Sequence, residues 1–283
     1  MDKLLQWSIA QQSGDKEAME RIGQPDPKML EQLFGGPDEP TLMKQSILIL
    51  DNDEATVENK LVAFENFEML IENLDNANNI QNMKLWPSII RQLSSPKLEF
   101  QVLAASIVGI ATQNNPNSQE AFLTHEDGLS SLVRLLADPQ TPESLVMKTL
   151  FALSSLVRNC QEACDKFVAL DGWKILNLSK AASERLLLRK LSLVSALLSG
   201  GLDNATKEHI HSDGVVGSIA ATLKTDGHLG CIEKALNIIS TLKASGYDFS
   251  TDELDILNQG LKNVEHVEML STDDLRSAQQ SLS

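Results

Sequence analysis

Reactive side chains are scarce in this chain, which has three cysteines and five histidines among 283 residues. Cys160 and Cys164 are four residues apart, so on a helix two thiolates could bind one metal ion. No second Cys or His pair follows nearby, which favours two ordinary thiols. His125 and His211 each lie two residues before an Asp-Gly pair, so they occupy the same repeat position and indicate a structural or surface role.

Motifs that carry catalysis are absent from the sequence. It contains no GxSxG nucleophile elbow, no GxxxxGK[ST] phosphate loop, no GxGxxG and no HExxH. Carboxylates are numerous, but no pair is set in an apolar stretch that would shift its pKa. We therefore expect no enzyme, no cofactor and no metal site; an enzyme would need a reaction without a recognised nucleophile.

The stretch 102–138 organises the chain, because its landmarks return twice. The pair Asp127-Gly128 recurs as Asp171-Gly172 and Asp213-Gly214, 44 and then 42 residues later, and a long helical pattern precedes each pair. A period in the low forties with three helices per unit is typical of armadillo or HEAT repeats. The string ALSSL, from Ala152, resembles the ALSNL of an armadillo third helix. The sequence predicts an all-α, right-handed armadillo-repeat solenoid of about four repeats with helical caps.

Composition limits the core and the partners. Apolar residues make up 42% of the chain and aromatic residues only 4%, so stacked Leu, Ile, Val and Ala must form the core. The formal charge of −15 disfavours nucleic acid, which needs a basic surface, and suits a partner with a basic face. No apolar run resembles a secretory signal or a membrane span, so we expect a monomer in the cytoplasm, with the nucleus as a second location.

Proline and glycine mark a boundary near the N-terminus. Pro25, Pro27 and the run Gly35-Gly36-Pro37 flank a short helical pattern, KMLEQLF, at 28–34. We predict a flexible segment at 1–36, a repeat domain at 37–260, and a capping helix with a polar, fraying tail at 261–283. The apolar cluster Leu4, Leu5 and Trp7 fits either a terminal helix packed on the solenoid or a mobile segment that peptide-binding chaperones accept.

Local signals predict where several helices begin and end. A long helix is expected from Thr56 to about Leu74, followed by a structured turn, Asp75 to Asn79, because Asn and Asp favour turns and caps. Further N-termini are predicted at four sites: Ser95-Pro96, Asn117 with Glu120, Thr141-Pro142, and Ser250 with Glu253.

The third helices of an armadillo stack line a concave groove. Phe151, Ser155 and Asn159 are spaced four apart, so we expect them on one groove-facing side of their helix. Armadillo proteins that bind extended peptides carry an asparagine where this chain has Ser155, and the equivalent positions hold Ala111 and Ser199. The missing asparagines disfavour a receptor for nuclear localisation signals.

Several strings together resemble the fungal cytosolic members of the Hsp70-binding-protein family, which are armadillo-type nucleotide exchange factors of heat-shock protein 70 chaperones. The similarity covers essentially the whole chain and is carried by LLQWSIAQQSGDKEAMERIGQPDPKMLEQLFGG, PTLMKQSI, KLVAFENFEMLIENLDNANNIQNMKLW and QNNPNSQ with the following DGL. Secretory relatives carry a signal sequence, which this chain lacks.

This resemblance implies a partner and a mechanism. The repeat body would embrace one lobe of the chaperone's nucleotide-binding domain and displace the other, so that ADP leaves. Contacts are expected at Asn76, Ala77 and Asn79, where a small Ala permits close approach, and at Arg189; ordinary capping and a solvated charge are the alternatives. Leu4, Leu5 and Trp7 match the family's substrate-release segment. A generic armadillo scaffold for another partner remains the alternative function.

Overall fold

A computed structural model describes residues 16, 17, 21 and 37–282. The predicted N-terminal release residues Leu4, Leu5 and Trp7 lie outside this part. Residues 37–282 form helices joined by loops, with no β-strand in that range. A helical hairpin, α4 (Glu39–Asp51) and α5 (Val57–Leu70), comes first, and α18 (Thr251–Val264) and α19 (Thr272–Ser281) come last.

Between these ends lie four units of three helices each. They are α6 (Leu74–Asn82), α7 (Trp86–Gln92) and α8 (Leu98–Thr112); α9 (Pro116–Leu123), α10 (Glu126–Ala137) and α11 (Glu143–Val157); α12 (Gln161–Ala169), α13 (Gly172–Leu176) and α14 (Glu184–Leu197); and α15 (Asn204–Ser212), α16 (Val215–Ala220) and α17 (Leu229–Ala244). Short 3₁₀ turns, Leu178–Lys180 and Leu198–Gly200, flank α14. The predicted armadillo architecture of about four repeats with helical caps is confirmed.

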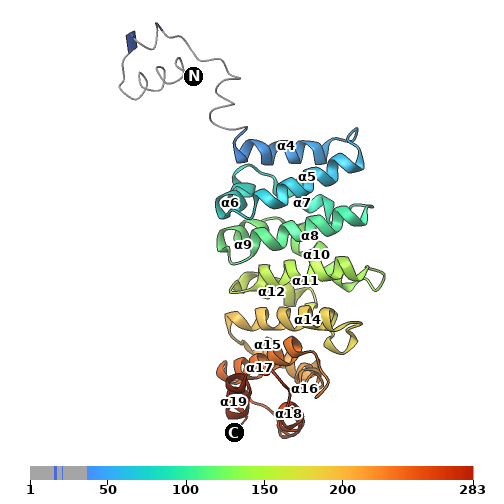
Figure 1. The fold of residues 1–283 in the computed structure, drawn as a ribbon, viewed down its shortest axis with the longest axis vertical. Helices are drawn as coiled ribbons and strands as arrows, with labels where there is room; N and C mark the ends of the chain where they lie inside the picture. Colours follow the sequence, from blue (N-terminus) through green and yellow to red (C-terminus); the bar gives the residue numbers. More distant parts are fainter. Residues whose placement is uncertain (1–15, 18–20, 22–36, 283) are drawn as a thin grey trace.

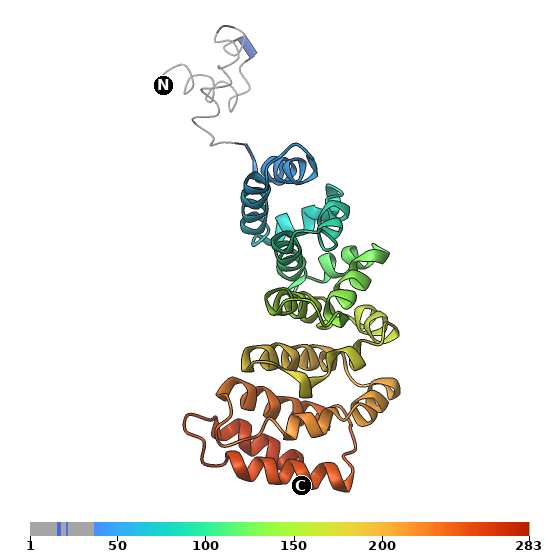
Figure 2. The ribbon, with the colours of Figure 1, turned by 90° about the vertical axis from the view of Figure 1, so that its right-hand side faces the viewer.

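Helices of the same rank pack on one another from unit to unit. The third helices α8, α11, α14 and α17 contact each other in that order, and α5 and α19 extend this row at its two ends. First helices pair as α6 with α9, and second helices as α7 with α10 and α10 with α13. Figures 1 and 2 show the result as a stack of layers along the long axis, with α4 at one end and α18 and α19 at the other.

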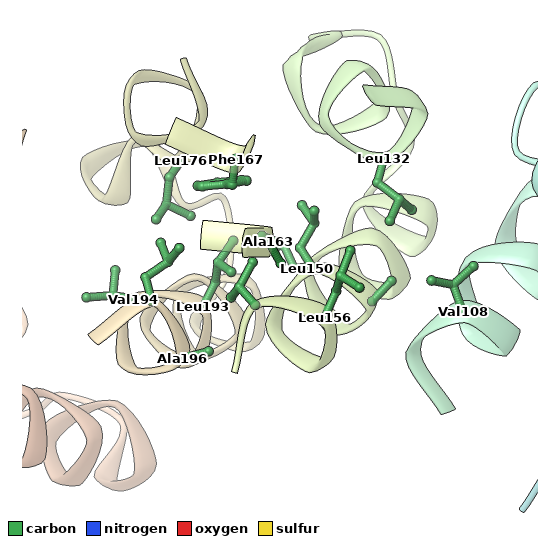
Figure 3. Packing of buried hydrophobic residues seen from close by; sticks show 14 of the residues in the cluster. Val108, Leu132, Leu150, Leu156, Ala163, Phe167, Leu176, Leu193, Val194 and Ala196 are labelled. Carbon is green, nitrogen blue, oxygen red and sulfur yellow. The ribbon is translucent and has the colours of Figure 1, made fainter. Parts of the chain in front are cut away.

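Apolar side chains fill the space between the layers. Leu150 and Leu156 of α11 are fully buried and lie among side chains from α8, α10, α12, α13 and α14 (Figure 3). Burying a leucine side chain stabilises the fold by about 1.5–3 kcal/mol. Since aliphatic side chains and alanines dominate this core, the stack is held by many modest contacts between neighbours.

The recurring Asp-Gly pairs have a packing explanation at two of three sites. A Cβ atom at Gly128 would lie 2.7 Å from the Phe122 ring, and one at Gly172 would lie 2.4 Å from the Phe167 ring. Both rings are fully buried, so neither can move aside. The glycine lets the first helix of a unit press its aromatic ring onto the start of the second helix.

The third pair, Asp213-Gly214, serves a different purpose. Gly214 has a φ of +64° and no heavy atom within 4 Å of its Cβ position, so backbone conformation rather than space selects glycine there. The weak first copy, Lys84-Leu85, reaches a similar left-handed conformation with Lys84, at φ 58°. The glycine of the Asp-Gly pair thus has two physical roles: close packing at Gly128 and Gly172, and a left-handed backbone conformation at Gly214.

Several predicted helix ends are wrong by a few residues. The helix expected to begin at Ser95 begins after Lys97, which makes no side-chain capping bond. The helix expected at Asn117 is capped by Asn115, whose side chain accepts from the Ser118 amide at 3.4 Å. Pro142 rather than Thr141 precedes α11, without a side-chain cap.

The two predictions at the C-terminal end had different outcomes. The Ser250 and Glu253 capping box is confirmed, with both reciprocal hydrogen bonds present. The predicted fraying after Ser271 is wrong, because the residues that follow form α19. This helix packs on α17, and its Ala278 is fully buried.

We expect Gly128→Ala to lower the free energy of unfolding by about 1–3 kcal/mol, because the added methyl group overpacks the Phe122 ring. Gly217→Ala is the matched control, since Gly217 lies in α16 and its nearest neighbour is 4.0 Å from the Cβ position. Alanine's helix propensity should leave that variant unchanged or stabilise it by about 0.5–1 kcal/mol. Urea unfolding followed by circular dichroism measures both; equal stability of the two variants would contradict the packing explanation.

Candidate partner-binding surface

The segment from Asp75 to Asn79 is helical, so the predicted turn is wrong. Helix α5 ends at Leu70, and the side chain of Asn73 then caps α6 by accepting from the amides of Asp75, at 2.9 Å, and Asn76, at 3.4 Å. The capping is therefore supplied by Asn73, which precedes this Asn-rich stretch. The residues after Asn73 form the first helix of a repeat.

Asn76 and Ala77 are buried, each with 3% of its surface exposed. The Asn76 amide donates to Glu39 Oε2 at 2.7 Å and to the Leu70 carbonyl at 2.9 Å, which joins α4, α5 and α6. The Ala77 carbonyl accepts from Ser118 Oγ of α9 at 3.2 Å. Asn79 is half-buried, and its side chain accepts from Asn82 at 3.1 Å.

Ser155 and Asn159 do not share one helical face as expected. Helix α11 ends at Val157, and Asn159 follows it with a φ of 55°, exposed, its amide donating to Ser199 Oγ at 2.8 Å. Ser155 is buried, with 5% exposed. Because the chain leaves the helix between them, the spacing of four no longer aligns their side chains.

Gln119 of α9 is a residue that sequence reasoning missed. Its buried side-chain amide donates to the carbonyls of Ser155 at 2.8 Å, Leu156 at 3.1 Å and Arg158 at 2.9 Å. These carbonyls at the end of α11 have no partner within their own helix, so Gln119 caps it from a distance. No local sequence signal could have identified this contact, because the two segments are 36–39 residues apart.

Arg189 lies on α14 with its side chain exposed, five residues after the helix begins at Glu184 rather than at the helix start. Its guanidinium carbon lies 5.5 Å from the centroid of the Phe151 ring of α11, a cation–π contact. The same ring packs on α8, where a Cβ at Gly109 would be only 2.4 Å away. Three layers therefore fix the position of this arginine.

Two adjoining depressions bring three of the predicted residues onto one surface. One depression, of about 330 Å³, is lined by Ala77 and by Gln113 and Asn114 at the end of α8. The second, of about 190 Å³, shares Gln113 and Asn114 and is lined by Ser155 and Arg189. We call all residues that line either of these two depressions the rim, which therefore includes Ala77, Gln113, Asn114, Ser155 and Arg189. Asn76, Asn79 and Asn159 do not line it.

Charge is unevenly distributed along the row of third helices. Basic residues occur on and just after α11 and on α14, whereas acidic residues occur on and just after α5. The basic group is Lys148, Arg158, Arg185 and Arg189; the acidic group is Glu58, Glu65, Glu68 and Glu72. Of these residues, Glu72 lines the first depression and Arg158 and Arg189 line the second, in a chain of net charge −15.

A hydrogen-bonded relay connects the acidic and basic groups. Ser106 of α8 is fully buried; its hydroxyl donates to the Glu68 carboxylate and accepts from Lys148 Nζ at 2.9 Å. The two hydrogen bonds satisfy the buried hydroxyl of Ser106, which lies between the negative charge of Glu68 and the positive charge of Lys148. The relay also links α5, α8 and α11 side by side.

The buried thiols of Cys164 and Cys231 are unsuited to nucleophilic chemistry at neutral pH. Burial raises the pKa of Cys164 to about 12, and burial also raises that of Cys231. Thiolate is the reactive and metal-binding form, so both side chains stay protonated. The described residues hold no cluster of three or more His, Cys, Asp or Glu placed to bind a metal ion. No helix in the same part of the chain is long and apolar enough to cross a bilayer.

Comparison with known structures supports the fold. The chain superimposes on a designed armadillo repeat protein, YIII(Dq.V1)4CPAF in complex with the peptide (KR)4, with a TM-score of 0.71, 15% identity, and coverage of 87% of this chain and 100% of the other. A second design, YIII(Dq)4CqI, gives a TM-score of 0.68 at 16% identity over 87% of this chain and 98% of that one. At such low identity the likeness concerns the fold alone.

Sequence comparison identifies the family. Residues 1–80 match the family described as nucleotide exchange factor Fes1, and residues 76–247 match the SIL1/FES1/HPBP1 C-terminal domain. The protein named Hsp70 nucleotide exchange factor FES1 from Debaryomyces hansenii is 55% identical over 99% of both chains. That of Saccharomyces cerevisiae is 44% identical over 97% of both. The chain therefore belongs to the SIL1/FES1/HPBP1 family of nucleotide exchange factors.

Proposed function

We propose that this protein binds the nucleotide-binding domain of cytosolic Hsp70 chaperones and promotes the release of ADP. The observation that carries the proposal is the similarity, over nearly the whole chain, to relatives named Hsp70 nucleotide exchange factor. It acts as a monomer in the cytoplasm, with the nucleus as a second location. Its action needs no catalytic residue, only a surface that distinguishes two forms of its partner.

The mechanism is a coupling of two binding equilibria. If the repeat body binds the open, ADP-free form of the chaperone more tightly than the closed form, it must weaken ADP binding by the same factor. A tenfold preference corresponds to about 1.4 kcal/mol. A stack in which each layer packs on the next is suited to this role. A stiff body that binds one lobe of the chaperone's nucleotide-binding domain can displace the other lobe.

The rim is the proposed centre of contact. Arg189 is exposed and held by Phe151, and the small side chain of Ala77 leaves room in the first depression. Asn79 and Asn159 extend the contact at its edge. Asn76 and Ser155 are buried and support it from beneath, by joining α4 to α6 and by presenting a carbonyl to Gln119. An arginine in a well-packed setting is a common energetic centre of an interface.

The N-terminal residues Leu4, Leu5 and Trp7 are proposed to compete for the chaperone's peptide-binding site and so to speed substrate release. They lie outside the described residues, and the proposal rests on their resemblance to the family's release segment; they fall within residues 1–80, which match the nucleotide exchange factor Fes1. A generic armadillo scaffold for another partner is the competing function. It would be favoured if the nucleotide-binding domain showed no affinity for this protein.

Stopped-flow release of a fluorescent ADP analogue tests the exchange activity. We expect micromolar protein to accelerate release from a cytosolic Hsp70 by about tenfold or more, which corresponds to about 1.4 kcal/mol of coupling. No acceleration by a folded sample would leave only the scaffold function.

Arg189→Ala should weaken chaperone binding by about tenfold or more, because it removes a guanidinium anchored at the rim. Calorimetric titration measures the affinity. Arg134→Ala is the matched control: Arg134 is also exposed, but it lies on α10 in the row of second helices, where its guanidinium donates to Ser94 Oγ at 2.8 Å. Equal effects of the two substitutions would argue against the rim.

Ala77 is a less selective probe than Arg189. Its side chain is 3% exposed, so Ala77→Arg would force a guanidinium into a packed site and disturb stability together with binding. An exposed side chain such as that of Arg189 can be removed while the unfolding free energy stays within about 1 kcal/mol of the original.

Deletion of residues 1–22 should leave ADP release intact and slow the release of a bound model peptide. The reason is that nucleotide exchange depends on the repeat body, whereas substrate release depends on Leu4, Leu5 and Trp7. Fluorescence anisotropy of a labelled peptide, followed alongside the ADP analogue, separates the two rates. If both slowed equally, the segment would belong to the repeat body.

A further inference from the structure

A groove between α4 and α5 has a lining unlike that of the rest of the surface. Its volume is about 590 Å³, and it is lined by one face of each helix. Among the thirteen lining residues only Glu54 is charged, whereas 22% of the chain is charged. The others are apolar or carry neutral polar side chains: Leu42, Gln45, Ser46, Ile49, Asn52, Ala55, Asn59, Val62, Ala63, Asn66, Met69 and Leu70.

Large apolar side chains that remain exposed gather around the same groove. Val62 is 54% exposed and Met69 is 64% exposed, and both line it. Of the nine large apolar residues with exposed side chains in the described part of the chain, three line the groove, Ile49 being the third, and three more lie close to it in sequence, between 48 and 74. Such a patch on a protein otherwise rich in surface charge marks a site where another segment binds.

Amide side chains give the groove polar contacts as well as apolar ones. Asn59 and Asn66 are seven residues apart on α5, so this pair repeats after two helical turns, while Gln45 lies on α4 and Asn52 is the residue that ends that helix. Amides both donate and accept hydrogen bonds. The combination suits a peptide segment with apolar side chains better than a charged ligand.

The chain itself supplies a segment of that kind next to the groove. Residues 28–34, which lie outside the described part, read KMLEQLF, with apolar residues at 29, 30, 33 and 34. Only three residues separate Phe34 from Asp38, the N-cap of α4. Four chain steps span up to about 14 Å, and Leu42 of the groove lies about 6 Å along the helix from Asp38, so Phe34 can reach it.

Two further considerations favour this occupant over a separate molecule. A short tether gives an effective concentration in the millimolar range, so a contact too weak to capture a free peptide is still populated. The first family match also covers residues 1–80, so the segment and the α4–α5 hairpin belong to the same matched sequence.

We propose that residues 28–34 dock in the groove between α4 and α5, with Met29, Leu30, Leu33 and Phe34 covering its exposed apolar side chains. Docking completes the N-terminal end of the stack, where α4 and α5 form the first layer (Figures 1 and 2). It also anchors the base of the chain that carries Leu4, Leu5 and Trp7, so that only about 27 residues remain to reach outward.

Hydrogen exchange of the full-length protein tests the docking. Peptides covering residues 28–34 should exchange at least about tenfold more slowly than a synthetic peptide of the same sequence. Val62→Glu should remove this protection by placing a carboxylate in the groove. Leu48→Glu is the matched control, because Leu48 is 69% exposed on α4 but does not line the groove, and it should retain the protection.

Met69→Glu serves as a second groove variant in case Val62→Glu perturbs the fold, which circular dichroism would reveal. Protection should be independent of protein concentration, because the contact is intramolecular. Loss of protection on tenfold dilution would overturn the proposal in favour of a second copy of the chain. Exchange of 28–34 at the free-peptide rate, or protection that survives both groove substitutions, would overturn it as well.

Discussion

The structure depends on one constraint: no unit can cover its own apolar surface, so each must lie close to the next. Aliphatic side chains supply most of the buried area, and close approach then becomes the limiting requirement. It explains why a glycine near the end of α8 faces the Phe151 ring, and why glycines lie in the first turns of the second helices, against Phe122 and Phe167. Polar contacts such as the relay from Glu68 through Ser106 to Lys148 are arranged along the same direction, from layer to layer.

The proposed binding surface is a by-product of this stacking. Arg189 belongs to α14, the ring beneath it to α11, and the space for that ring to α8, so no single unit holds a complete contact. Asn76 similarly unites the first three helices through Glu39 and the Leu70 carbonyl. A surface assembled from several layers keeps its shape only while the layers stay in register, which suits the proposed mechanism of nucleotide exchange.

The architecture could be predicted from sequence because periodicity is a global signal repeated four times, which outweighs local ambiguity. The helix ends at Lys97 and Asn115 were misplaced because several capping residues lie close together and tertiary packing selects among them. The turn preference of Asn and Asp predicts a turn at residues 75–79. The segment is helical instead, and the burial of Asn76 and Ala77 indicates that tertiary packing determines this conformation. Of the predicted site, Ala77, Ser155 and Arg189 meet at the rim. Contacts between distant segments, such as Gln119 with the end of α11, leave no trace in local sequence.

The spacing of the cross-layer hydrogen bonds has a consequence for how the protein reaches its native state. Ser118 with Ala77, Lys148 with Ser106, and Arg134 with Ser94 are joined across 41, 42 and 40 residues, about one repeat each. Because each layer needs only its predecessor as a template, ordering can propagate along the chain while synthesis is still under way. Contacts of such limited sequence separation carry a small loop-closure cost and favour rapid folding. A protein that assists the chaperone machinery would then make little demand on that machinery for its own folding.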